Sequence, residues 1–349
     1  MRHRFAALVA ASTAVLIFAG GLVTSTESGL SVPDWPTTYG YSMFTFPLSK
    51  MVGGIKYEHS HRLIASTVGF LIVILAVWLW RAEPRAWVRR LGYVALAAVT
   101  TQGVLGGITV LYYLPDPISI AHASLAQIVF SLTMTIAIVT APGWMRGYSS
   151  RGTPPDDRVL QRVAILTAAA VYIQIIVGAT MRHTGAGLAI PDFPLAFGQL
   201  IPAHWDQKIA IHFAHRVGAL IATACVLATT GHVFYHHRDR AELVRPSILL
   251  LVLVATQVTL GALTVLSRKD VLINSLHVVT GGCVLATTVV LALRAHRARF
   301  AGVRNAGSNR LRQGSGGPPK LHAKAEEQDP AYDSSLRSAG AIRTAGDHA

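Results

Sequence analysis

Long apolar runs separated by short polar segments dominate the chain. Each run is close to the roughly 20 residues that an α-helix needs to cross the hydrocarbon core of a bilayer. We therefore predict an all-α polytopic membrane protein with eight transmembrane helices in a lipid bilayer. The predicted spans are residues 5–23, 61–80, 88–112, 118–140, 159–181, 209–235, 246–266 and 272–293.

The composition agrees with this class. Hydrophobic residues make up 52% of the 349 residues and charged residues only 14%, whereas charged residues are about a quarter of a typical soluble domain. A formal net charge of +14 would suit a nucleic-acid partner, but Lys and Arg lie between the apolar runs and in the tail, without a basic stripe or an aromatic platform. The charge therefore indicates membrane topology and no nucleic acid as a partner.

The distribution of Lys and Arg predicts the orientation. These residues concentrate in alternate loops, and such loops stay on the cytoplasmic side. Both termini are then expected in the cytoplasm, and two long loops, at about 24–58 and 182–208, are expected to face outward. Residues 1–23 also have the basic start and apolar run of a signal peptide, but a counterpart in the second half indicates a retained span.

An internal repeat divides the spans into two sets. Four markers recur in the same order, displaced by 154 to 158 residues. They are GLSVPDWP (29–36) and GLAIPDFP (187–194), His61-Arg62 and His215-Arg216, TQGVLGGITVL (101–111) and TQVTLGALTVL (256–266), and His122 and His277. Because each set has an even number of spans, the two sets share one orientation, which is a parallel repeat.

This repeat predicts the domain organisation. The N-terminal four-helix half covers residues 1–145, a cytoplasmic linker covers 146–158, and the C-terminal four-helix half covers 159–298. The remaining residues, 299–349, are rich in Gly, Ser and Pro and carry mixed charges. Such a composition has little to bury, so we expect a disordered cytoplasmic tail.

Four repeated histidines are the candidate ligands. His61, His122, His215 and His277 all enter their spans from the outward side, so the imidazoles are expected at a similar depth, with one pair in each half. Two imidazoles on facing helices of a bundle can bind the two faces of a heme. A single histidine could instead bond between helices, and zinc is disfavoured because neither half supplies a third or fourth ligand with suitable spacing.

Charged neighbours distinguish the two halves. Arg62 and Arg216 directly follow a histidine and would suit heme propionates, although a topological or snorkelling role is the alternative. Glu58 stands three residues before His61, and the equivalent position in the second half is His212. Positions three apart share a helix face. A carboxylate is therefore expected beside one site only, where it would accept a proton or stabilise a carbocation unless it is simply solvated.

Other polar residues of the repeat have structural interpretations. Gln102 and Gln257 are expected to hydrogen-bond between helices. Asp34 and Asp192 are expected to stabilise the turns at PDWP and PDFP, which fold each outer loop back over its half. His59 lies beside Glu58 and His61, and His212 lies three residues before His215. We interpret these two additional imidazoles as residues of the loops or of the surroundings of the sites.

These motifs together resemble one family. The chain from about residue 5 to 293 resembles heme A synthase, the membrane enzyme that oxidises a methyl substituent of heme O to the formyl group of heme A by successive hydroxylations, for cytochrome oxidase. The resemblance rests on GLSVPDWP, on Glu58-x-x-His61-Arg62 and on the remaining repeated histidines. It implies a heme b cofactor on His215 and His277 beside Arg216, a heme O substrate on His61 and His122 beside Arg62, and a catalytic Glu58.

The resemblance also implies partners and a place in the cell. Heme O synthase (protoheme farnesyltransferase) would supply the substrate, an unidentified membrane electron acceptor would receive electrons, and a homo-oligomer is compatible. The expected location is a bacterial plasma membrane, with the heme sites toward the extracytoplasmic side. Some relatives carry an outer-loop cysteine pair that this chain lacks, which puts a thiol role in doubt.

Two other functions remain open from the residues. A diheme b-type membrane electron-transfer cytochrome would also use paired histidines, but electron transfer across the membrane favours hemes at two depths. A transporter would also show internal repeats, but it predicts broken helices and ionisable groups near the midplane. The sequence shows continuous spans with polar groups at their outer ends.

Overall fold

The computed structural model describes residues 1–145 and 157–297, and within these ranges eight helices are long and apolar enough to cross a membrane. They are α1 (Arg2–Ser25), α2 (Gly54–Ala82), α3 (Ala86–Leu111), α4 (Asp116–Thr140), α6 (Arg158–His183), α7 (Gln207–His236), α8 (Ala241–Leu266) and α9 (Val271–Ala295). A short α5 (Pro142–Met145) and a 3-10 turn (Leu48–Lys50) complete the described helices. The prediction of an all-helical, multi-pass membrane protein is confirmed. The predicted tail and most of the predicted linker lie outside the described residues.

Two helices begin at least five residues earlier than the hydropathy predicts. α2 starts at Gly54 rather than at residue 61, so Glu58 lies within the helix and not in the loop. α8 starts at Ala241 and contains Pro246, which has no N–H and leaves the Glu242 carbonyl without its helical donor. The Arg294 guanidinium donates to that carbonyl. An interhelical bond thus replaces the one that proline removes, and the helix continues through it.

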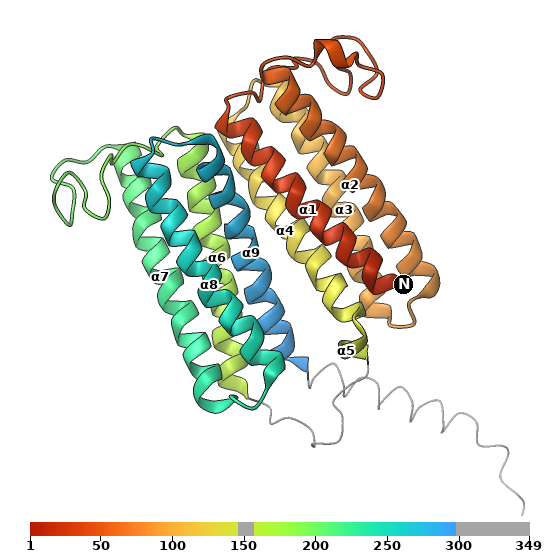
Figure 1. Cartoon of the computed structure of the whole chain (residues 1–349), viewed down its shortest axis with the longest axis vertical. Coiled ribbons are helices and arrows are strands. Elements are labelled where there is room, and N and C mark those ends of the chain that lie inside the picture. The colour runs from red at the N-terminus through yellow and green to blue at the C-terminus, as the bar shows by residue number, and fades with distance from the viewer. Residues whose placement is uncertain (146–156, 298–349) are drawn as a thin grey trace, which may run out of the picture. The chain divides into compact units, whose positions relative to one another are not determined.

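The helices pack in two sets of four (Figure 1). In the N-terminal set, α1 and α3 each contact α2 and α4. In the C-terminal set, α6 and α8 each contact α7 and α9. α9 also packs on α1 and α4, and α4 packs on α6. α4 and α9 are the most buried of the described spans.

Small residues allow these helices to approach closely. A side chain added at Gly21 of α1 would meet the backbone of Ser275 on α9, and one added at Gly282 of α9 would meet Gln127 on α4. In lipid, where helices gain little from apolar burial against each other, such close backbone contact contributes to their association. Arg182, at the end of α6, adds hydrogen bonds to the α1 residues Gly21 and Ser25.

An ion-pair cluster ties the start of α1 to the α2–α3 connection. The Glu83 side chain is 1% exposed and accepts hydrogen bonds from Arg85 Nε at 2.6 Å and from Arg2 at 3.2 Å. Arg85 also donates to the Val139 carbonyl near the end of α4. Burial raises the pKa of Glu83, but the hydrogen bonds and charge of Arg85, together with the charge of Arg2, outweigh it and leave this pKa below its ordinary value.

We expect Glu83→Gln to lower the free energy of unfolding at pH 7 by about 2 kcal/mol, because hydrogen bonds between charged groups are lost. The folded-state pKa is lowered, so the stabilisation is complete above the ordinary value of 4.5 and is lost as the pH falls below it. Unfolding measured in detergent between pH 7 and pH 3 should show the two proteins converging. Exposed Glu27→Gln is the control, and a constant difference across the range would contradict the assignment.

Candidate functional site

The four repeated histidines occupy matching places in the fold. Each lies six to eight residues after the first residue of its helix, which is α2, α4, α7 or α9. These helices all start at the end of the molecule that carries the two long loops (Figure 1). The structure therefore places all four imidazoles near one end of the bundle, below the loops.

Each imidazole ring lies against a glycine of the preceding long helix. A side-chain carbon added at any of these glycines would come within 2.9 to 3.2 Å of the ring Cε1, which is tighter than ordinary van der Waals contact. The pairs are Gly20 with His61, Gly106 with His122, Gly178 with His215, and Gly261 with His277. The space for each ring is thus created by the missing side chain on the neighbouring helix.

In the C-terminal set the two rings approach each other edge to face. The ring centroids of His215 and His277 are 6.5 Å apart, with an angle of 73° between their planes. A metal ion lies about 2.0 Å from an imidazole nitrogen, so two imidazoles on opposite sides of one ion have centroids roughly 6 Å apart. The observed separation would allow both imidazoles to bind one iron.

Glutamine side chains hold these two rings. His277 Nδ1 lies 3.2 Å from the main-chain oxygen of Gln257, and the Gln257 amide nitrogen lies 3.4 Å from His277 Nε2. Donation from Nδ1 to a carbonyl leaves Nε2 with the lone pair that a metal needs. The Gln174 amide nitrogen lies 3.0 Å from His215 Nδ1 and donates to the His215 carbonyl. Gln257 therefore bonds between helices, as expected.

The N-terminal pair lies under the first loop. His61 and His122 are close enough to interact electrostatically, and both are partly buried. His61 Nδ1 is buried without a hydrogen-bond partner, so this atom is available to a bound group. The structure thus brings each predicted histidine pair together.

Glu58 and His212 perform the same task in the two halves. The Glu58 carboxylate, 3% exposed, accepts a hydrogen bond from the Val32 N–H at 2.8 Å and one from Arg62 at 2.6 Å. His212 Nδ1 accepts from the Ile190 N–H at 3.2 Å. Val32 and Ile190 are equivalent positions of the repeat. Both side chains anchor the outer loop, and only Glu58 adds a negative charge.

Arg62 and Arg216 clamp the same loops. Their terminal nitrogens donate to three main-chain carbonyls each, a geometry that the planar guanidinium fork suits. The acceptors are Val32, Asp34 and Thr37 for Arg62, and Ile190, Asp192 and Leu195 for Arg216. The sequence predicted propionate binding or snorkelling for these arginines, and their loop-holding role was not foreseen. Arg216 Nε is buried and has no partner.

The predicted turn role of the two aspartates is confirmed. Asp34 accepts from the N–H groups of Tyr39 and Gly40, and Asp192 accepts from those of Phe197 and Gly198. The Gly198 N–H is the main cause of a lowered pKa for Asp192. Slight burial raises the pKa of Asp34, but bonds from Gly40, Thr37 and Tyr39 bring it below its ordinary value.

The loop also rests on the helices beneath it. A side chain at Gly107 of α3 would overlap the Trp35 ring, so Trp35 of PDWP packs directly on that helix. His59, almost fully buried, lies 3.1 Å from the Thr38 hydroxyl through Nδ1. His59 and His212 therefore belong to the loop contacts, as interpreted from the sequence.

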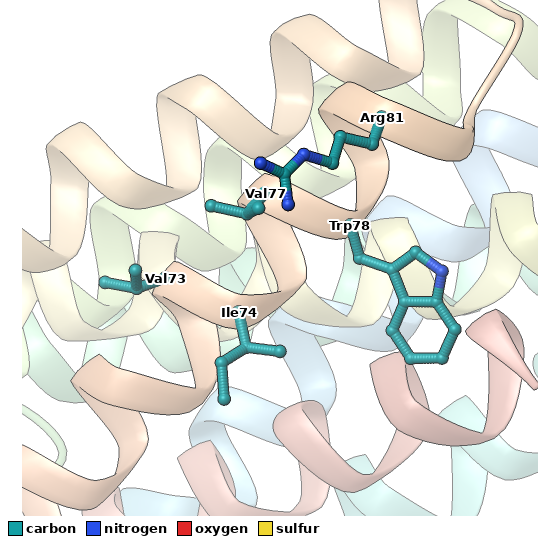
Figure 2. Close-up of a pocket in the computed structure, with 5 residues that line it drawn as sticks. All are labelled: Val73, Ile74, Val77, Trp78 and Arg81. Carbon is teal, nitrogen blue, oxygen red and sulfur yellow. The ribbon is translucent and has the colours of Figure 1, made fainter.

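A surface hollow on α2 is separate from the histidines. It is lined by Val73, Ile74, Val77, Trp78 and Arg81 (Figure 2). All five residues belong to one helix and begin twelve residues beyond His61, which is about 18 Å along a helix. The hollow offers no ligand set, so the candidate site remains at the histidine end.

The chain is similar to proteins of one known family. Residues 41–289 match the COX15-CtaA family, described as cytochrome oxidase assembly protein. The heme A synthase of Geobacillus kaustophilus is 27% identical over 302 residues, which cover 84% of this chain and 92% of the relative. The heme A synthase of Symbiobacterium thermophilum is 30% identical over 281 residues, covering 76% and 87%. That of Halalkalibacterium halodurans is 29% identical, covering 78% and 90%.

The chain belongs to the COX15-CtaA family. Besides the loop-holding role of the two arginines, two further features of the site were not predicted from the sequence. Gln174 lies beside His215 although its equivalent in the first half, Leu16, is apolar; a lone amide in an apolar span was the available signal. The glycines that face the rings were visible only as small residues, because their partners depend on helix packing.

We expect Arg216→Gln to loosen the second outer loop of this family member. Each hydrogen bond from a charged donor contributes about 1.5–3 kcal/mol, and about 1.4 kcal/mol corresponds to a factor of ten. Hydrogen exchange of residues 187–200 should therefore accelerate at least about tenfold, while exchange within α6 and α8 is unchanged. Exposed Lys208→Gln is the control. Unchanged loop exchange in Arg216→Gln would refute the clamp.

Proposed function

We propose that this chain is a heme A synthase, which oxidises a methyl substituent of heme O to the formyl group of heme A by successive hydroxylations. The observation that carries the proposal is the paired arrangement of histidines at one end of the helices, with the His215–His277 centroids 6.5 Å apart. The names of the relatives, which cover most of the chain, support it. The enzyme class is an oxidoreductase that acts on a CH3 group.

The C-terminal half (159–298) is proposed to hold heme b between His215 and His277. Heme b bound there supplies a redox-active iron that can take up electrons. Arg216 lies one residue from His215, and its partnerless Nε is a donor that can serve a propionate. The Gln257 carbonyl orients His277 for ligation.

The N-terminal half (1–145) is proposed to bind the substrate heme O between His61 and His122, with Arg62 at its edge. Glu58 is the proposed catalytic group. Both of its oxygens accept hydrogen bonds, which favours a carboxylate that stabilises positive charge at the reacting carbon over one that abstracts a proton. Each hydroxylation would exchange one C–H bond for a C–O bond to a hydroxyl from water and release two electrons and two protons, one from the carbon and one from the water. A negative charge beside that carbon would stabilise the positive charge that develops as the electrons leave.

The membrane setting is also proposed. We propose a parallel repeat with both termini and the linker (146–158) in the cytoplasm, and with both sites toward the extracytoplasmic side of a bacterial plasma membrane. Heme O synthase (protoheme farnesyltransferase) would deliver the substrate, and a membrane electron acceptor would reoxidise the cofactor. A homo-oligomer is compatible with this arrangement. The Arg and Lys residues at the opposite helix ends support the orientation.

The catalytic test uses Glu58→Gln, which keeps an oxygen for the Val32 N–H but removes the charge. Expressed beside a heme O source, the wild-type chain should yield heme A, and the variant should yield at least about a hundredfold less, a typical loss for one electrostatic group. Extracted hemes are measured by chromatography and mass spectrometry.

The matched control is His212→Gln, because His212 anchors the second loop in the same way. It should retain heme A production. Equal loss in both variants would assign Glu58 a structural role only. Absence of heme A from the wild-type chain, with two b-type hemes bound, would favour a diheme electron-transfer cytochrome instead.

The cofactor test replaces one ligand at a time. His215→Ala or His277→Ala should abolish the b-type absorption of the purified protein or change it to that of a heme with one imidazole ligand, because one of the two proposed iron ligands is removed. Exposed His204→Ala should leave the spectrum unchanged. An unaltered spectrum in either ligand variant would exclude that pair as the heme b site.

A further inference from the structure

A second cluster of potential ligands lies at the other end of the C-terminal helices. Asp157 precedes α6 and caps it, His232 lies in the last two turns of α7, and His237 directly follows α7. α6 and α7 run in opposite directions side by side (Figure 1), so the beginning of one meets the end of the other. His232 is seventeen residues beyond His215, or about 25 Å along the helix. The cluster is therefore separate from the proposed heme site.

The side chains converge on one oxygen. Nε2 of His232 and Nε2 of His237 each lie 2.7 Å from Asp157 Oδ2. The other carboxylate oxygen, Oδ1, accepts from the Leu160 N–H at 2.9 Å. The cap fixes the carboxylate, while Oδ2 and the two nitrogens remain directed at a common point. His237 is buried, and Asp157 and His232 are partly buried.

We propose that Asp157, His232 and His237 form a binding site for a divalent transition metal of the zinc class. Two imidazoles and one carboxylate are a ligand set that Zn²⁺ uses when it keeps one position open. Calcium and magnesium are disfavoured because they take oxygen ligands. The three donor atoms lie within 4.8 Å of one another, so one ion could bind all three after a small movement of the side chains.

Only a small rearrangement is needed for binding. Zinc–ligand distances of about 2.0–2.2 Å place tetrahedral ligands roughly 3.3 Å apart, whereas the nitrogens are now 2.7 Å from the oxygen. A rotation of the imidazoles that moves their Nε2 atoms by roughly half an ångström would make room for the ion. The ring protons would then lie on Nδ1, which leaves each Nε2 free to bind the metal.

The site would cross-link α6 and α7 at the end opposite to His215. The alternative is a hydrogen-bonded cap in which both imidazoles donate to the carboxylate and no metal binds. The two arrangements differ in metal affinity and in the response to metal of each ligand variant, and both can be measured on the intact chain.

The experiment uses the full-length, heme-loaded chain, purified in detergent with a tag that contains no histidine and treated with a chelator. Titration with Zn²⁺ by calorimetry should show one equivalent bound, and Co²⁺ should give the visible absorption of a site with nitrogen and oxygen ligands. Asp157→Asn keeps a good N-cap but loses the charged ligand. It and His237→Ala should weaken Zn²⁺ binding at least about tenfold, since loss of even supporting groups has such an effect.

The matched control is His236→Ala, because His236 is exposed and its ring lies 4.5 Å from that of His232 without joining the cluster. It should bind Zn²⁺ as the wild type does. An unchanged heme spectrum in all variants establishes that they fold. Three results would overturn the proposal. They are the absence of a stoichiometric Zn²⁺ site, equal affinity in the wild type and Asp157→Asn, and loss of binding in His236→Ala but not in His237→Ala.

Discussion

The close approach of neighbouring helices at a glycine is the constraint on which the histidine sites depend. Each imidazole occupies volume that any other residue on the preceding long helix would fill. A large polar ring inside a span is costly unless its orientation is fixed and its polar atoms are used. The glycine gives the ring one position, and in the C-terminal set glutamines bond to its nitrogens. The rings are thereby held before any ligand is bound, which reduces the ordering cost of binding.

The outer loops complete these sites from above. An arginine in the helix reaches three loop carbonyls, and the side chain four residues earlier accepts a loop N–H. Because this arginine directly follows the histidine, movement of the loop and movement of the ligand helix are coupled. The aspartate of each PDWP or PDFP turn fixes the rest of the loop. Loop and histidines therefore form one unit in each half.

Part of this could be predicted from the sequence. The spans followed from hydropathy, and the histidine pairs followed from register and helix direction, because both depend on spacing within the chain. The start of α8 could not be predicted, since the tolerance of Pro246 depends on Arg294 from another helix. The loop clamp of Arg62 and the cluster around Asp157 were also missed. Both arise from residues that are distant in sequence and meet only through packing.

The repeat shows how one exchanged residue changes the charge of a site. In the first half, Glu58 pairs with Arg62, so the loop anchor is close to neutral. In the second half, His212 accepts a hydrogen bond at Nδ1, so its imidazole is neutral. The position equivalent to Glu58 therefore carries no carboxylate that could pair with Arg216. Under the proposed function, the second half attracts the anionic propionates of a resident heme more strongly than the first. A substrate must leave after oxidation, and the weaker electrostatic hold of the first half is consistent with that requirement. The Glu58 carboxylate would thus have two roles. It would take part in the oxidation, and it would distinguish the site that releases its heme from the site that keeps it.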